Sequence, residues 1–128
     1  MNFPKDLKYS ASHEWARIEG DTATIGITDF AQGELGDIVF VELPAVGSKV
    51  TQNKPLGTVE AVKAVTDLNA PISGEVTAIN GALEGTPDAV NKDAYGAGWM
   101  VKIKADTPDP LSALMTGKEY ATFIRNIA

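Results

Sequence analysis

The chain has 128 residues, a length that suits a single domain, 1–128, with a modest core. Hydrophobic residues make up 44% of it, which is typical of a folded protein, and no apolar run approaches the roughly 20 residues of a membrane helix. Its 17 acidic residues outnumber the 11 basic ones, and this excess disfavours nucleic acid as a partner. The chain contains no cysteine, which excludes disulfides and thiolate sites.

Residues 1–6 carry neither the apolar segment of a signal peptide nor the Arg-rich pattern of a transit peptide. We therefore expect a cytoplasmic protein without membrane contact, and a processed organellar form would show the same pattern. We also expect a monomer.

Two short strands open the chain. Residues 13–18 and 22–27 have the spacing of strands, and Glu19-Gly20-Asp21 supplies a turn between them. In the second strand, Ala23, Ile25 and Ile27 share one face, which predicts that this face is buried.

A helix and a third strand follow. Thr28 is placed to cap a helix over Asp29–Leu35, and Gly36 is placed to end it. The β-prone run Ile38–Leu43 predicts the strand, in which we expect Phe40 to be buried.

A hairpin with Lys63 at its bend occupies the middle of the chain. Residues alternate in polarity before Lys63, and the apolar residues Leu68, Ala70 and Ile72 share a face after it. Lys63 is the only basic residue between Lys54 and Lys92, a span that holds five acids: Glu60, Asp67, Glu75, Glu84 and Asp88. Most exposed lysines on hairpins only keep the edge soluble, so the flanking sequence has to decide whether Lys63 does more.

The last part of the chain changes from strands to helices. Strands are predicted over 74–79 and 99–104, the second with Val101 and Ile103 inward and Met100 outward. A short helix is predicted to start at Pro110 and to end at Gly117. A final helix carries an apolar stripe suited to covering a sheet: Tyr120, Phe123, Ile124 and Ile127.

Nothing in the sequence indicates catalysis. The only histidine, His13, lies on a predicted strand, where a structural role is expected. One histidine and no cysteine also give no metal site, and the calcium-loop spacings are absent. We therefore expect a protein that is not an enzyme. The strands and turns alone predict a two-sheet sandwich or a flattened barrel.

The residues around Lys63 resemble a known modification site. Glu60-x-Val62-Lys63-Ala64, followed by Asp67 and by Ala-Pro-Ile-Ser-Gly-Glu-Val at 70–76, is similar to the hairpin of lipoyl carrier proteins, and more narrowly to the H proteins of the glycine cleavage system. Biotin carriers typically have methionines where this chain has Val62 and Ala64. The resemblance covers nearly the whole chain, through Ser-His-Glu-Trp at 12–15, Ile-Gly-Ile-Thr at 25–28, Ala-Gln at 31–32, Leu-Gly-Asp-Ile-Val-Phe-Val-Glu-Leu-Pro at 35–44 and Tyr-Gly-x-Gly-Trp-Met at 95–100.

This resemblance implies a fold, a cofactor and partners. The fold is mainly β, a barrel-sandwich hybrid like that of lipoyl and biotin carriers, with short helices and a C-terminal helical cap. The cofactor is lipoate, held covalently on Lys63. Its partners are a pyridoxal-phosphate (PLP) glycine decarboxylase, a tetrahydrofolate-dependent aminomethyltransferase, dihydrolipoyl dehydrogenase with FAD, and lipoylating enzymes. The chain would shuttle the aminomethyl group of glycine among the first three.

The resemblance also implies roles for single residues. Glu60 and Gly74 match positions that lipoylating enzymes recognise. Ser12, Glu14 and Asp67 match the residues that receive the loaded arm. We therefore expect these three to converge on one cleft beside the hairpin, with both carboxylates ionised.

Two positions depart from the family pattern, and other functions stay open. Ala61 stands where a serine is usual, and Val65 where a small or hydroxylated residue is common. Either difference would alter how the arm packs or how modifying enzymes accept the site. The alternatives are a lipoyl or biotin carrier module of another multienzyme system, a lipoate-relay protein, and an unmodified interaction domain on the same fold.

Overall fold

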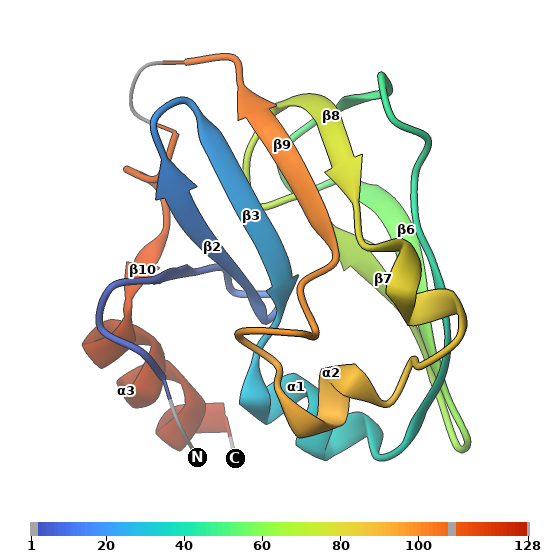
Figure 1. Ribbon diagram of the computed structural model, residues 1–128. Coiled ribbons are helices and arrows are strands. Elements are labelled where there is room, and N and C mark those ends of the chain that lie inside the picture. The colour runs from blue at the N-terminus through green and yellow to red at the C-terminus, as the bar shows by residue number, and fades with distance from the viewer. Residues whose placement is uncertain (1–2, 108–109, 128) are drawn as a thin grey trace.

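The computed structural model describes residues 3–107 and 110–127, whose strands form two sheets (Figure 1). The larger sheet has the order β10 (Met115–Thr116), β1 (Lys8–Tyr9), β2 (Glu14–Glu19), β3 (Thr22–Ile27), β9 (Val101–Ala105), β8 (Gly74–Ile79) and β5 (Lys49–Val50). The smaller sheet has the order β4 (Ile38–Glu42), β6 (Pro55–Ala61) and β7 (Val65–Asn69). Neighbouring strands are antiparallel throughout these two sheets.

The main hydrophobic core joins the two sheets. The larger sheet contributes Ile25 and Ile103, and the smaller one contributes Val59 and Leu68, all of them fully buried. Burying one such side chain stabilises the fold by about 1.5–3 kcal/mol. The core therefore holds the lysine hairpin, formed by β6 and β7, against the larger sheet.

A second cluster lies under the C-terminal helix α3 (Gly117–Ile127). Tyr120 of this helix stacks on Tyr9 with ring centroids 4.8 Å apart, and Trp15 and Ile124 are buried in the same cluster. The apolar stripe predicted for the last helix thus covers the sheet on its Tyr120 and Ile124 side.

The first helix is α1 (Asp29–Leu35), with the bounds predicted from the sequence. The Thr28 hydroxyl accepts a hydrogen bond from the Ala31 amide at 3.2 Å, and Gly36 ends the helix with a φ of 81°, which other residues rarely adopt. The short helices η1 (Gly81–Glu84) and α2 (Ala89–Lys92) follow β8, and α2 lies beside α1 (Figure 1). Among the described residues, no helix is both long and apolar enough to cross a membrane.

Phe40 is not buried as predicted: 48% of its surface is exposed. The pairing of β4 with β6 is irregular between Ile38 and Phe40, where a bulge changes the alternation of faces. Ile38 and Val41 therefore point into the core, and Phe40 points outward. Met100, which we expected to face outward, is fully buried.

The helix predicted from Pro110 to Gly117 is also wrong. Residues 110–113 form turns, and Met115 and Thr116 form the short strand β10, which pairs with β1. Gly117 begins α3 instead of ending a helix. A Cβ at Gly117 would lie 3.0 Å from the Phe3 carbonyl oxygen, so a larger residue here would crowd the N-terminal segment.

Candidate functional site

Lys63 lies at the tip of the β6–β7 hairpin, as the sequence predicts. The Ala61 amide donates to the Ala64 carbonyl at 2.7 Å, which closes the tip around Val62 and Lys63. Both of these residues are exposed, Val62 by 77%. Within the described residues, Lys63 has no ion pair and no hydrogen-bonded side-chain partner. Its ammonium group is therefore open to another protein.

A cleft of about 410 Å³ lies beside the hairpin, between the start of β2, α1 and β7. Its polar residues include Ser12, Glu14 and Asp67, so the structure brings together the three side chains that were expected to converge. Its apolar walls are formed by Ile27, Phe30, Ala31, Leu35 and Ile127, and its other lining residues are polar or charged. A cleft with apolar walls and carboxylates suits an aliphatic group that ends in a cation.

The Lys63 side chain lies next to the wall of this cleft. It passes Gly36, at the end of α1: a Cβ on Gly36 would lie 3.5 Å from Lys63 Cε. Glu34 and Leu35, the two residues before Gly36, line the cleft. A group attached to Lys63 Nζ therefore starts close to the cleft.

Glu14 is buried, with 1% of its surface exposed, and its carboxylate is held by three donors. The hydroxyls of Ser10 and Ser12 each donate to Glu14 Oε1 at 2.6 Å, and the Asn69 amide of β7 donates to Oε2 at 3.3 Å. Burial raises the pKa of Glu14, and these hydrogen bonds oppose that rise. The ordinary carboxylate pKa assumed from the sequence therefore does not apply to Glu14.

His13 lines the cleft and has the structural contacts expected of it. Its Nδ1 is 2.8 Å from the Tyr120 hydroxyl, and its ring packs against Phe30 with centroids 5.0 Å apart. Burial lowers the pKa of His13, and the charge of Glu34 partly opposes this effect. The lowered pKa disfavours the charged imidazolium, which would repel a cation from the cleft.

The two residues that match recognition positions lie in different environments. Glu60 is exposed, and its neighbours across the small sheet are Phe40 and Val65. Gly74 is buried in β8, where a Cβ would collide with the Lys104 carbonyl oxygen and lie 2.8 Å from Ile103 Cγ2. The missing side chain of Gly74 thus allows a close backbone approach to strand β9 of the same chain.

Two other features lie outside this site. Within residues 3–107 and 110–127, no three His, Asp or Glu side chains are grouped so that they could hold a metal ion. A second cavity, of about 560 Å³, lies between Phe3 and the start of α3, and no residue of the lysine hairpin lines it.

Comparison with known proteins gives the family. The family model described as glycine cleavage H-protein matches residues 7–127. The chain belongs to the glycine cleavage H-protein family. It is 57% identical over 119 residues to the glycine cleavage system H protein of Rubrobacter xylanophilus, covering 92% of this chain and 91% of that one.

Further members of the H-protein family agree in sequence and in fold. The glycine cleavage system H protein of Salinibacter ruber is 54% identical over 121 residues, with 94% of this chain and 98% of that one covered. The crystal structure of the Mycobacterium marinum H protein superposes with a TM-score of 0.89 at 38% identity, covering 95% of this chain and 98% of that one. This likeness confirms the predicted barrel-sandwich hybrid.

The sequence of this H-protein family member did not predict which apolar residues line the cleft. Three of these residues come from α1, at positions 30, 31 and 35, and they share one helical face with Glu34, which also lines the cleft. That spacing was visible in the sequence, but it is also the spacing of a helix that packs on a core. Ser10, which donates to the buried Glu14 carboxylate, was missed as well.

The residues of the site fit lipoate, the group that the resemblance implies. An amide on Lys63 Nζ requires an exposed amine, which the hairpin tip presents. The aliphatic part of lipoate matches the apolar walls around Phe30 and Leu35.

Proposed function

We propose that the chain is a lipoyl carrier of the glycine cleavage system, with lipoate joined to Lys63 through an amide bond. The observation that carries this proposal is the exposed Lys63, without an ion-pair partner among residues 3–107 and 110–127, on a closed hairpin directly beside a cleft with apolar walls and carboxylates. The names of the relatives, all glycine cleavage system H proteins, support the same role.

The chemistry belongs to the cofactor and to the partner enzymes. Attached to Lys63, lipoate would supply a disulfide able to take up an aminomethyl group. The PLP-dependent glycine decarboxylase would load this group, the tetrahydrofolate-dependent aminomethyltransferase would remove it, and dihydrolipoyl dehydrogenase would reoxidise the arm. The chain itself presents Lys63 and offers a surface that each enzyme recognises. It acts as a carrier and not as a catalyst.

The cleft residues hold the arm between visits to these enzymes. The apolar walls exclude water from an aliphatic chain, and the carboxylates of Glu14 and Asp67 attract a cationic amine, with Ser12 as a further hydrogen-bonding group. Charge-assisted hydrogen bonds of this kind contribute roughly 1.5–3 kcal/mol, which favours docking without trapping the arm.

Recognition by the lipoylating enzyme falls to Glu60, because it is exposed near the hairpin tip. Gly74 contributes indirectly: its missing side chain lets β8 lie close to β9. In the family pattern, both positions affect modification, and here they do so by different physical means.

Peptide mass mapping after incubation with a lipoate ligase tests the attachment site. We expect one lipoyl adduct, on the peptide that contains Lys63, and none in Lys63→Arg. Lys54→Arg is the matched control and should be modified like the parent chain. A biotin adduct in cells, or lipoylation of Lys54 or Lys92, would contradict the proposal.

The role of the cleft has its own test. Glu14→Gln combined with Asp67→Asn removes both negative charges with little change of shape. We expect faster loss of the aminomethyl group from the isolated carrier, with unchanged lipoylation at Lys63. An unchanged rate of loss would mean that these carboxylates do not receive the group.

A further inference from the structure

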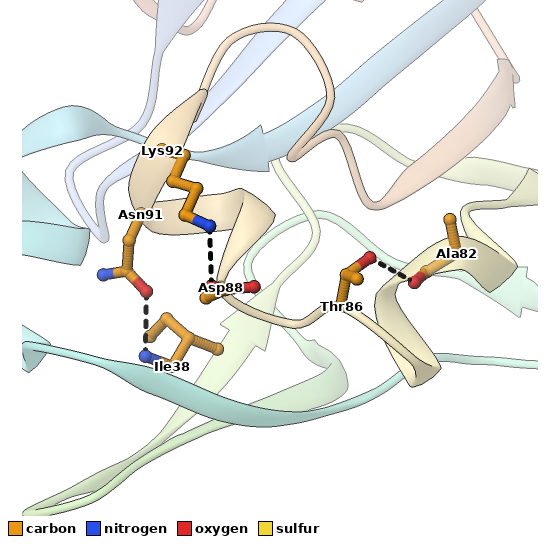
Figure 2. Close-up of polar contacts among 6 residues, drawn as sticks. All are labelled: Ile38, Ala82, Thr86, Asp88, Asn91 and Lys92. Atoms are coloured by element: carbon orange, nitrogen blue, oxygen red, sulfur yellow. Dashed lines mark hydrogen bonds and ion pairs between the residues drawn. The ribbon is translucent and has the colours of Figure 1, made fainter.

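Asn91 of α2 connects three parts of the chain through its side chain, and Figure 2 shows one of these connections, the hydrogen bond with the Ile38 amide. Its Oδ1 accepts a hydrogen bond from the Ile38 amide at 2.9 Å, and its Nδ2 donates to Gln32 Oε1 and to the Gly36 carbonyl, both at 2.9 Å. An amide N–H can only donate and a carbonyl can only accept, so these partners fix the orientation of the Asn91 side chain.

The segment held by Asn91, residues 36–38, is also the segment that contacts the lysine hairpin. The Asp37 carbonyl accepts a hydrogen bond from the Val62 amide at 3.2 Å, and Ile38 pairs with Ala61. The Gly36 backbone lies beside the Lys63 side chain. Asn91 and Lys63 therefore both contact this segment, although no hydrogen bond joins these two residues directly.

Asn91 also holds the wall of the cleft. Its partner Gln32 lies on α1, which contributes Phe30, Glu34 and Leu35 to the cleft. The backbone of Asn91 is itself held in place, because its neighbour Val90 is fully buried in the main core. One side chain thus joins the core, the cleft wall and the base of the lysine hairpin.

We propose that Asn91 is a positioning residue for the modification of Lys63: it fixes residues 36–38, and through them the place where Lys63 is presented relative to the cleft. This inference rests on the proposed lipoylation of Lys63. Asn91 does not touch the reacting amine, so its effect is on placement. A small displacement of a reacting group lowers the reaction rate within the bound complex more than it lowers the binding affinity, because the reaction requires a narrow range of geometries.

The test compares Asn91→Ala with Asn80→Ala in steady-state lipoylation by a purified lipoate ligase. Asn80 is a matched control, since its side chain also makes three hydrogen bonds, in its case to backbone groups of Ala82, Ala97 and Trp99, none of which lines the cleft or belongs to the hairpin. We expect both variants to lower Tm by several degrees, which is the usual scale of such losses. Only Asn91→Ala should lower kcat, by about tenfold, with KM for the carrier nearly unchanged because Glu60 is untouched.

Hydrogen exchange gives a second readout that needs no enzyme. The Val62 amide should exchange about tenfold faster in Asn91→Ala than in the parent chain, because its partner Asp37 is released, and should be unchanged in Asn80→Ala. Asn91→Asp keeps the acceptor for Ile38 but loses both donors, so its kcat should lie between the parent and Asn91→Ala. If Asn91→Ala does not fold, Asn91→Asp is measured in its place.

The outcomes separate the two proposals. A parent chain that the ligase does not modify at Lys63 would refute the proposed function. A modified parent together with an unchanged kcat and unchanged Val62 exchange in the Asn91 variants would overturn the positioning role. An equal loss of kcat in Asn80→Ala would overturn it too, because general destabilisation would then explain the effect.

Discussion

The tip of the lysine hairpin and the buried end of the cleft differ in how tightly their charged groups are held. Lys63 is exposed and has no partner within the described residues. Glu14 is buried and receives hydrogen bonds from Ser10, Ser12 and Asn69. Under the proposed function, Lys63, which other enzymes would have to reach, is left free, and Glu14, which would receive the returning group, is held in one place. Substitutions in the two regions should therefore affect different properties.

Gly74→Ala should have the largest effect, and on stability. The added Cβ meets backbone and the buried Ile103 side chain, which cannot move aside easily. We expect the free energy of unfolding in urea to fall by about 3 kcal/mol or more. Gly33→Ala is the control: nothing lies within 4 Å of its Cβ, and on α1 it should stabilise by about 0.5–1 kcal/mol. If the Gly74→Ala chain is stable but is lipoylated slowly, then Gly74 acts in recognition by the ligase and not in packing.

Glu14→Ala should come next. It leaves the hydroxyls of Ser10 and Ser12 and the Asn69 amide without their acceptor, and we expect a loss of about 2–4 kcal/mol. Asp67→Asn, at the exposed rim of the same cleft, should stay within about 0.5 kcal/mol. Urea unfolding of both variants measures the difference. Equal losses would show that the two carboxylates are held alike.

The pH dependence of stability should show the burial of Glu14. Because its pKa is raised in the folded chain, the native state binds more protons than the unfolded chain, so stability falls as pH rises from the ordinary glutamate range through the raised pKa. Each pKa unit by which Glu14 differs between the folded and the unfolded chain corresponds to about 1.4 kcal/mol in the free energy of unfolding. The trend should be missing in Glu14→Gln.

An NMR titration of Glu14 measures its pKa in the folded chain directly. Ser10→Ala removes a donor to the carboxylate and should raise the midpoint further. A midpoint at or below the ordinary glutamate value would contradict the effect assigned to burial.

Glu60→Gln should have the smallest effect on folding, within about 0.5 kcal/mol, because its side chain is exposed. It should nevertheless slow lipoylation at Lys63. Thermal unfolding and the rate of ligase modification, measured on one preparation, test both expectations. An unchanged rate would reduce Glu60 to a residue that only keeps the surface polar.

The sequence was informative where structure depends on neighbours in the chain. The limits of α1 follow from Thr28 and Gly36, whose cap and left-handed conformation are local features. The place of Lys63 at the bend follows from the alternation on either side of it. The predicted helix at Pro110 failed because residues 115–116 pair with β1, more than a hundred positions away.

Burial and charge could not be predicted in the same way. Phe40 is exposed because of a bulge against β6, which depends on the partner strand. The raised pKa of Glu14 depends on its burial in the folded chain, which outweighs the opposing hydrogen bonds from Ser10, Ser12 and the Asn69 amide of β7. The three cleft residues came from the family resemblance, since they lie far apart in the chain and no local pattern connects them.

The hydrogen bond from Asn69 to Glu14 has a consequence for association between chains. β7 is an edge strand of the small sheet, and unpaired amides on such an edge attract strands of other molecules. Glu14 occupies one of these amides with a charged acceptor from inside the same chain. The Asn69 amide, at one end of this edge, is thus not available for pairing with a strand of another molecule.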